Sequence, residues 1–173
     1  MVTALHDPAA PAALGRRAAL IAFAVPTALL GGAYLGQYGF GLYPCEMCWW
    51  QRYGHFAALA LALLALLRPA QQRWLAALAA VAIIAAGLIG AFHAGVEYQW
   101  WQGFTTCSAA PGAGSGIDPL QAVLDAPLVR CDQVQWQLLG ISLAGFNFLI
   151  SVPAGLFVLG LLRRADRAGG GRA

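Results

Sequence analysis

Long apolar stretches, separated by short polar segments, constrain this chain more than any other feature of its sequence. They cover about residues 18–36, 49–67, 74–93 and 138–162. Each approaches the roughly 20 residues that a helix needs to cross the hydrocarbon core of a bilayer. Hydrophobic residues make up 60% of the chain and charged residues only 10%, which is far from the composition of a soluble globular protein. The sequence therefore predicts an all-α membrane protein.

The connections between the stretches predict how the helices are arranged. Only residues 68–73 separate the second stretch from the third, so these two helices are expected to be antiparallel neighbours. A cleaved signal peptide has an apolar core of about 7–15 residues, which is shorter than the first stretch and favours an uncleaved helix there. We therefore expect an antiparallel four-helix transmembrane bundle. Its expected parts are a disordered tail at 1–15, one domain at 16–164, loops at about 37–48 and 95–137, and a second tail at 165–173.

The arginines predict the orientation of this bundle. The chain has 10 basic and 7 acidic residues, a small excess that could serve a nucleic acid or a membrane surface. Only Arg52 and Arg130 fall on the side of the two loops. The other basic residues fall on the side of the tails and the short turn: Arg16, Arg17, Arg68, Arg73, Arg163, Arg164, Arg167 and Arg172. This distribution favours membrane lipid over nucleic acid as the partner, with both termini in the cytoplasm.

Two cysteines, Cys45 and Cys48, form a C-x-x-C motif where the first loop runs into the second apolar stretch. If that stretch is a helix, Cys48 lies in its first turn, where free N–H groups and the helix dipole favour a thiolate. Arg52 shares the helix face of Cys48, so its guanidinium can stabilise the same thiolate. This pattern is typical of a reactive dithiol. A c-type haem is disfavoured because Trp49, and not a histidine, follows Cys48.

The second loop carries the other two cysteines, Cys107 and Cys131. Between them, Asp118, Pro119 and Gln121 predict the start of a short helix, whose apolar face is expected to lie on the membrane surface. In the expected topology all cysteines lie outside the cytoplasm, where disulfides persist. Four cysteines allow three pairings, and the residues alone do not choose among them.

Two polar residues near the outer end of the third stretch, His93 and Glu97, are further candidates. They lie one helical turn apart, near the level expected for Cys48. His93 can donate a hydrogen bond to a bound electron acceptor, with Glu97 orienting the ring; the alternative is an interfacial pair without a role in turnover. His55 and Asn147 are expected to form hydrogen bonds between helices. No flavin or nicotinamide fingerprint is present, and a lipid-soluble acceptor suits a reactive sulfur at the bilayer boundary.

The residues from the first cysteine onward read Cys45-Glu46-Met47-Cys48-Trp49-Trp50-Gln51-Arg52. This run resembles the CxxCxxQR motif of the DsbB family, bacterial inner-membrane proteins that form disulfide bonds by reducing a quinone. The resemblance extends to the four apolar stretches and to the two-cysteine loop ahead of the fourth. Bacterial relatives of vitamin K epoxide reductase have similar chemistry, but their CxxC lies at the end of a late helix.

The resemblance implies a protein-disulfide oxidoreductase with four catalytic cysteines, namely Cys45, Cys48, Cys107 and Cys131. A periplasmic DsbA-like thiol oxidoreductase would attack a Cys107–Cys131 disulfide at Cys107. Electrons would then reach the Cys45–Cys48 pair through an intermediate that joins Cys45 to Cys131. The implied acceptor is ubiquinone or menaquinone, bound by Cys48, Arg52 and His93.

Two alternatives belong to other functional classes. A metal-binding or metal-transporting membrane protein could use the cysteines and His93 as ligands, since zinc commonly takes four Cys or His ligands. Against it, Cys107 and Cys131 are too far apart in the sequence to form a zinc knuckle. A structural membrane protein could use disulfides only to hold its loops.

The distribution of arginines gives a testable topology. We expect a membrane-impermeant thiol reagent to label reduced Cys45 and Cys107 from the periplasmic side of intact cells, because eight of the ten arginines lie on the opposite side. Mass spectrometry of the labelled peptides checks this. Labelling that requires permeabilisation of the inner membrane would contradict both the topology and the expected partner.

Overall fold

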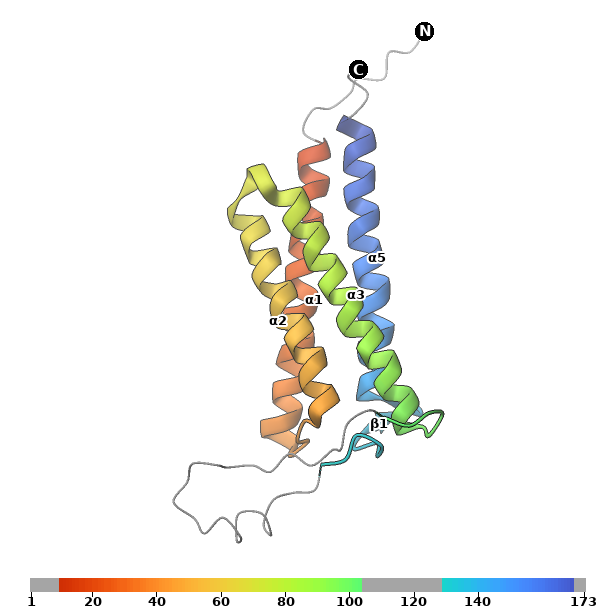
Figure 1. Cartoon of the computed structure of the whole chain (residues 1–173). Coiled ribbons are helices and arrows are strands. Elements are labelled where there is room, and N and C mark those ends of the chain that lie inside the picture. Colours follow the sequence, from red (N-terminus) through yellow and green to blue (C-terminus); the bar gives the residue numbers. More distant parts are fainter. Residues whose placement is uncertain (1–9, 104–128, 170–173) are drawn as a thin grey trace.

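A computed structural model describes residues 10–103 and 129–169 (Figure 1). Its helices are α1 (Ala10–Phe40), α2 (Glu46–Leu67), the 3-10 helix η1 (Pro69–Gln71), α3 (Gln72–Glu97) and α5 (Leu143–Gly169). Two short strands, β1 (Gln137–Leu138) and β2 (Ile141–Ser142), pair antiparallel, with Gln137 opposite Ser142 and Leu138 opposite Ile141.

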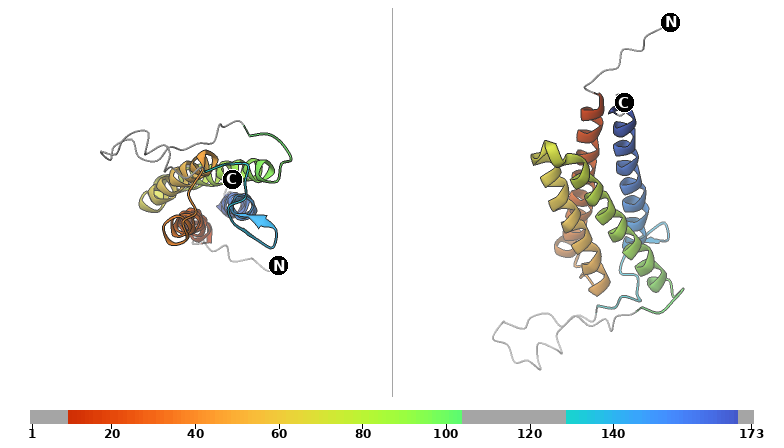
Figure 2. Two further views of the ribbon diagram at one scale, coloured as in Figure 1. Left: turned by 90° about the horizontal axis from the view of Figure 1, so that it is seen from below. Right: turned by 45° about the horizontal axis from the view of Figure 1, so that its top comes forward.

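The four long helices lie side by side as a bundle (Figures 1 and 2). α3 packs mainly against α5 and α2, and α1 packs against the same two helices from the other side. The start of α1, the η1 connection and the end of α5 share one end of the bundle (Figure 1). The CxxC motif and the strand pair therefore lie together at the opposite end.

Three helical segments of the described chain are long and apolar enough to cross a membrane: Ala10–Phe40, Pro69–Glu97 and Leu143–Gly169. α2 has 22 residues, but its first half carries polar side chains that include Gln51, Arg52 and His55. The prediction of a predominantly helical membrane protein is confirmed. Passage of all four helices through the membrane stays a prediction.

The bounds of the helices differ from those predicted. α1 begins at Ala10, within the segment predicted as a disordered tail, because the alanine-rich run there has a high helix propensity and Pro11 is tolerated in a first turn. α5 continues to Gly169, where an ion pair of 2.5 Å between Arg73 and Asp166 joins it to α3. At this end of the bundle, α1 and α5 therefore extend beyond the apolar stretches.

α5 starts at Leu143 because the strand pair occupies the residues just before it. Leu139 and Gly140 connect the strands with φ of 53° and 77°, the positive values that a tight two-residue hairpin requires. These strands were not predicted from the sequence. They fix the direction in which the chain leaves the second loop and enters α5.

Alanine dominates the buried core between the helices. Small side chains let helix backbones approach closely, which favours association where lipid supplies no hydrophobic drive. The buried residues of this core are Ala18, Ala19, Ala22, Ala58, Ala62, Ala65, Ala76, Ala79, Ala80, Ile83, Val158, Leu161 and Leu162.

The close contact between α3 and α5 gives a prediction about stability. A Cβ atom at Gly155 would lie 2.5 Å from Ile84 Cγ1 and 2.9 Å from the Ala80 carbonyl oxygen, whereas a Cβ at Gly160 meets nothing within 4 Å. We expect Gly155→Ala to destabilise the folded protein by about 1–3 kcal/mol, as overpacking does. Gly160→Ala, on the same helix, is expected to be neutral or stabilising because alanine favours helix. Unfolding midpoints in detergent check this, and equal midpoints for the two variants would contradict it.

Candidate functional site

The CxxC motif caps the helix that carries it. Cys45 is the N-cap residue of α2, and its Sγ accepts a hydrogen bond from the backbone N–H of Cys48 at 3.4 Å. Glu46 places an acidic side chain in the first turn, which suits the positive end of the helix dipole. The helix therefore begins at the motif because the motif provides its own cap.

The sulfur of Cys45 is buried among hydrogen-bonding groups, so Cys107 is the better reporter for the labelling that the sequence predicted at both residues. Cys45 is 2% exposed, and its Sγ lies 3.3 Å from Cys48 Sγ and 3.5 Å from His93 Nε2. The hydrogen bond with Cys48, with a smaller contribution from His93, lowers the pKa of Cys45 to about 4, although burial acts in the opposite direction. A thiolate is thus favoured at Cys45, whereas the sequence predicted one at Cys48. The reason is geometric, since N–H groups of a first turn point back toward the cap residue.

Arg52 contacts α1. Its guanidinium donates hydrogen bonds to Gln37 Oε1 at 2.6 Å and to the Ala33 carbonyl at 3.2 Å. It also lies 4.8 Å from the ring centre of Tyr34 and 5.0 Å from that of Trp49, within range of cation–π attraction. The sequence predicted a contact between Arg52 and a cysteine sulfur, but its described contacts include none. Within the described residues no carboxylate pairs with this buried cation.

A cavity of about 660 Å³ lies beside the two cysteines, within the range of about 300–1,000 Å³ usual for small-molecule sites. Apolar residues of α1 between Ala28 and Gly36 line one wall, and α5 contributes Ala144 and Phe146. The polar end holds four of the predicted site residues: Cys45, Cys48, Arg52 and His93. An apolar channel with a few convergent polar groups suits a ligand that has a polar head and an apolar body.

His93 is buried beside the cysteines, with an exposed fraction of 2%. Its Nδ1 lies 3.0 Å from Gln51 Nε2, and its Nε2 lies 3.9 Å from Glu97 Oε1. The backbone of Cys131 also hydrogen-bonds to the ring. The other carboxylate oxygen of Glu97 is buried without a hydrogen-bond partner among the described residues. The predicted proximity of His93 and Glu97 is therefore present, and both line the cavity.

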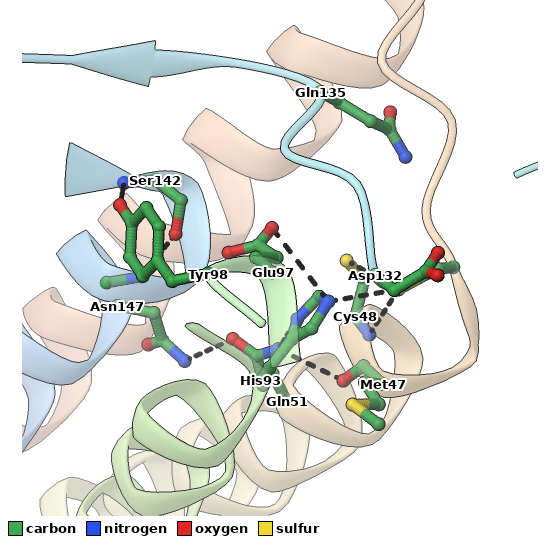
Figure 3. A network of polar contacts seen from close by, with 12 residues as sticks. Met47, Cys48, Gln51, His93, Glu97, Tyr98, Asp132, Gln135, Ser142 and Asn147 are labelled. Atoms are coloured by element: carbon green, nitrogen blue, oxygen red, sulfur yellow. Dashed lines mark hydrogen bonds and ion pairs between the residues drawn. The ribbon is translucent and has the colours of Figure 1, made fainter. Parts of the chain in front are cut away.

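A chain of polar side chains runs from His93 into the bundle (Figure 3). Gln51 Oε1 accepts a hydrogen bond from Asn147 Nδ2 at 2.8 Å, which joins α2 to α5. Asn147 Oδ1 in turn lies 2.8 Å from His55 Nε2 and accepts a bond from Ser151 Oγ at 2.8 Å. His55 and Asn147 therefore hydrogen-bond between helices, as predicted.

Cys131 belongs to the same buried cluster as Cys45. It is 2% exposed and packs with Cys45, Met47, Val96 and Val129. Cys131 is disulfide-bonded, whereas Cys45 and Cys48 are free. Cys107 and the predicted surface helix lie outside the described residues, so the pairing of Cys107 stays a prediction.

The site has some of the ligand atoms that the metal-binding alternative requires. Cys45, Cys48 and His93 each offer one ligand atom, and these atoms lie within 4.8 Å of one another. A structural zinc site takes four such ligands, and this group supplies three among the described residues.

Gln37 and Gln51 are two residues of the site that were not predicted from the sequence. Gln51 could have been found, because it lies one turn after Met47 and one turn before His55, on the helix face that carries the cysteine motif inward. Gln37 could not, since its contact with Arg52 depends on how α1 crosses α2.

Comparisons with known proteins identify the family of this chain. The family model for the disulfide bond formation protein DsbB matches residues 15–161. Proteins named Disulfide bond formation protein B match from Verminephrobacter eiseniae (34% identity over 160 residues, 90% of this chain and 89% of that protein) and from Marinobacter nauticus (32% over 156 residues, 83% and 90%). A third, from Aromatoleum aromaticum, is 34% identical over 152 residues, 82% of this chain and 89% of that protein. No solved structure matches the chain significantly. Because the match covers most of the chain, including all four cysteines and most of each long helix, the chain belongs to the DsbB family of disulfide bond formation proteins.

Proposed function

We propose that this chain is a thiol oxidase of the bacterial inner membrane. It reoxidises a periplasmic DsbA-like dithiol protein and passes the electrons to a membrane quinone. The observation that carries this proposal is the meeting of a free Cys45–Cys48 pair with the disulfide-bonded Cys131 in one buried cluster beside an apolar cavity. Cysteine pairs in contact exchange disulfides by thiolate attack, with no further group required.

Burial supports an order for the exchange. Cys131 is 2% exposed, so a soluble partner attacks the other sulfur of the loop disulfide, which we assign to Cys107. The Cys107–Cys131 bond breaks, a mixed disulfide with the partner forms, and Cys131 leaves as a thiolate. That thiolate attacks Cys45 in the Cys45–Cys48 disulfide, and Cys48 leaves as a thiolate. The second thiol of the partner then releases Cys107 and completes the oxidation of the partner.

The cavity fits a quinone. Arg52 and His93 would hold the polar head beside Cys48, and the α1 wall between Ala28 and Gly36 would receive the apolar tail. When bound, a quinone provides an acceptor for two electrons and two protons. Arg52 has no described carboxylate partner, so its charge is available to stabilise negative charge on the acceptor.

The proposed topology places the cysteine end of the bundle in the periplasm. All four long helices cross the membrane, including α2, whose polar half faces the cavity and the neighbouring helices instead of lipid. The distribution of arginines supports this orientation.

The assignment of Cys107 as the attacked sulfur predicts which cysteine the partner can reach. The test uses a background without Cys45 and Cys48 and a partner that has only its first active-site cysteine. We expect this partner to form a stable mixed disulfide with a Cys131→Ala variant that carries thionitrobenzoate on Cys107. The matched Cys107→Ala variant, with thionitrobenzoate on Cys131, is expected to react at least tenfold more slowly, because Cys131 is buried. Release of thionitrobenzoate is followed by absorbance. Equal rates for the two variants would overturn the assignment.

The contacts of Arg52 predict its effect on quinone use. Arg52→Gln removes a buried charge and its hydrogen bonds, and charged hydrogen bonds contribute about 1.5–3 kcal/mol, so we expect the KM for quinone to rise about tenfold or more. Arg52→Lys keeps the charge but loses the planar fork and should lie between wild type and Gln. The rate of attack of the partner on the loop disulfide is the internal control and should be unchanged. An unaltered KM for quinone in Arg52→Gln would reduce Arg52 to a structural contact of α1.

A further inference from the structure

We propose that Gln51 and Asn147 are positioning residues that hold the proton of His93 on Nε2, so that this N–H faces the sulfur of Cys45. The inference rests on the proposed function for its role in turnover, but its geometry stands on described contacts alone. These contacts run from two backbone carbonyls, through two amides, to one ring. Figure 3 shows the part formed by Met47, Gln51, Asn147 and His93.

The orientation of the Gln51 amide is fixed first. Its Nε2 lies 3.1 Å from the carbonyl oxygen of Met47 and 3.0 Å from His93 Nδ1. A carbonyl oxygen can only accept a hydrogen bond, so the amide atom that faces Met47 must be the nitrogen. A flipped amide would set two oxygens against each other.

Asn147 fixes the same orientation independently. Its Nδ2 lies 3.0 Å from the Ala86 carbonyl oxygen and 2.8 Å from Gln51 Oε1. The Ala86 carbonyl requires the nitrogen of Asn147 at this position, and that nitrogen requires the oxygen of Gln51 opposite it. To flip Gln51, the chain would have to break bonds to carbonyls on both α2 and α3.

The tautomer of His93 follows from the amide. An amide N–H can only donate, so His93 Nδ1 must accept and carries no proton. In the neutral ring the proton is then on Nε2, which lies 3.5 Å from Cys45 Sγ and 3.9 Å from Glu97 Oε1. Both neighbours accept from an N–H when they are ionised. The opposite tautomer would face the N–H of Gln51 with a second N–H in a site that is 2% exposed.

This N–H acts when Cys45 becomes a leaving group. In the proposed relay, the Cys107 thiolate attacks Cys131 in the Cys45–Cys131 disulfide. The Cys107–Cys131 bond forms, the Cys45–Cys131 bond breaks, and the electron pair leaves on the sulfur of Cys45. The product has the state seen in the structure, with Cys131 disulfide-bonded and Cys45 and Cys48 free. Because a stabilised thiolate leaves faster, His93 Nε2–H and Cys48 N–H promote this step.

The test reads the tautomer directly. Long-range ¹H–¹⁵N correlation spectra of protein labelled with [¹⁵N]histidine in detergent distinguish the two ring tautomers, and His93→Gln identifies the signals of His93. We expect the Nε2–H form in the reduced wild-type protein. An Nδ1–H form in this spectrum would overturn the proposal, and the measurement needs neither partner nor quinone, so its failure is separate from failure of the proposed function.

The variants test what the tautomer does. Gln51→Leu removes the donor to His93, and Asn147→Leu removes the group that holds Gln51. The control Ser151→Ala removes a donor to Asn147 Oδ1 on the side away from Gln51. We expect the two Leu variants to give a mixture of tautomers and to release Cys45 about tenfold more slowly, and the control to match wild type.

The thiolate absorbance near 240 nm, measured at neutral pH in proteins that keep only Cys45, is the second readout and should fall in the Leu variants. In the full protein, the other ionisable groups around this sulfur are Cys48 and Arg52 of α2, Glu97 of α3 and Arg130 of the loop. Cys48 is replaced in all the proteins compared here, and the other three groups are unchanged in all of them. Wild-type tautomer and thiolate content in both Leu variants would overturn the proposal, even if activity were lost.

Discussion

The side-chain amide of Gln51 connects three helices within the buried polar network of the bundle. It bonds to its own helix at Met47, to α3 at His93 and to α5 at Asn147. A buried polar group without a partner costs about 1–3 kcal/mol, so the helices are favoured in the one arrangement that satisfies all of these groups. Gly90 leaves the space for this arrangement, since a Cβ there would lie 2.8 Å from the Ala144 carbonyl oxygen and 2.9 Å from Asn147 Nδ2. The position of the cysteines thus depends on polar contacts inside a bundle whose bulk packing is alanine.

The local parts of the site could be predicted from the sequence, and the contacts between helices could not. A helix starting at the CxxC motif places Cys48 in a first turn from periodicity alone, and the apolar stretches indicate the membrane class. The partner of Arg52 depends on the crossing of α1 and α2, which no spacing within α2 reveals; hence the guanidinium was expected at a sulfur and lies at Gln37. The thiolate was expected at Cys48 because charge near a helix start was considered, but not the direction in which the first N–H groups point.

The metal-binding alternative depends on the same histidine. A metal bound by Cys45, Cys48 and His93 would need a lone pair on Nε2, the ring nitrogen that lies 3.5 Å from the Cys45 sulfur. The amide of Gln51 directs its N–H at Nδ1 and thereby leaves the proton on Nε2. A histidine that binds a metal through Nε2 usually donates its other N–H to an acceptor, and here that place is taken by a donor. The polar network therefore favours hydrogen bonding to sulfur over coordination of a metal at this site.

Arg52 and the Cys45 sulfur both line the cavity, but different helices hold them. Arg52 is held by α1 through Gln37 and Ala33, whereas the Cys45 sulfur is held by the start of α2 and by His93 of α3. A direct ion pair between the guanidinium and a thiolate would neutralise both groups and make the sulfur a poorer electron donor. Because α1 supplies neutral acceptors to Arg52, its positive charge remains available to an acceptor in the cavity. Under the proposed function, this arrangement lets one site stabilise both a leaving thiolate at Cys45 and the negative charge that develops on the proposed acceptor.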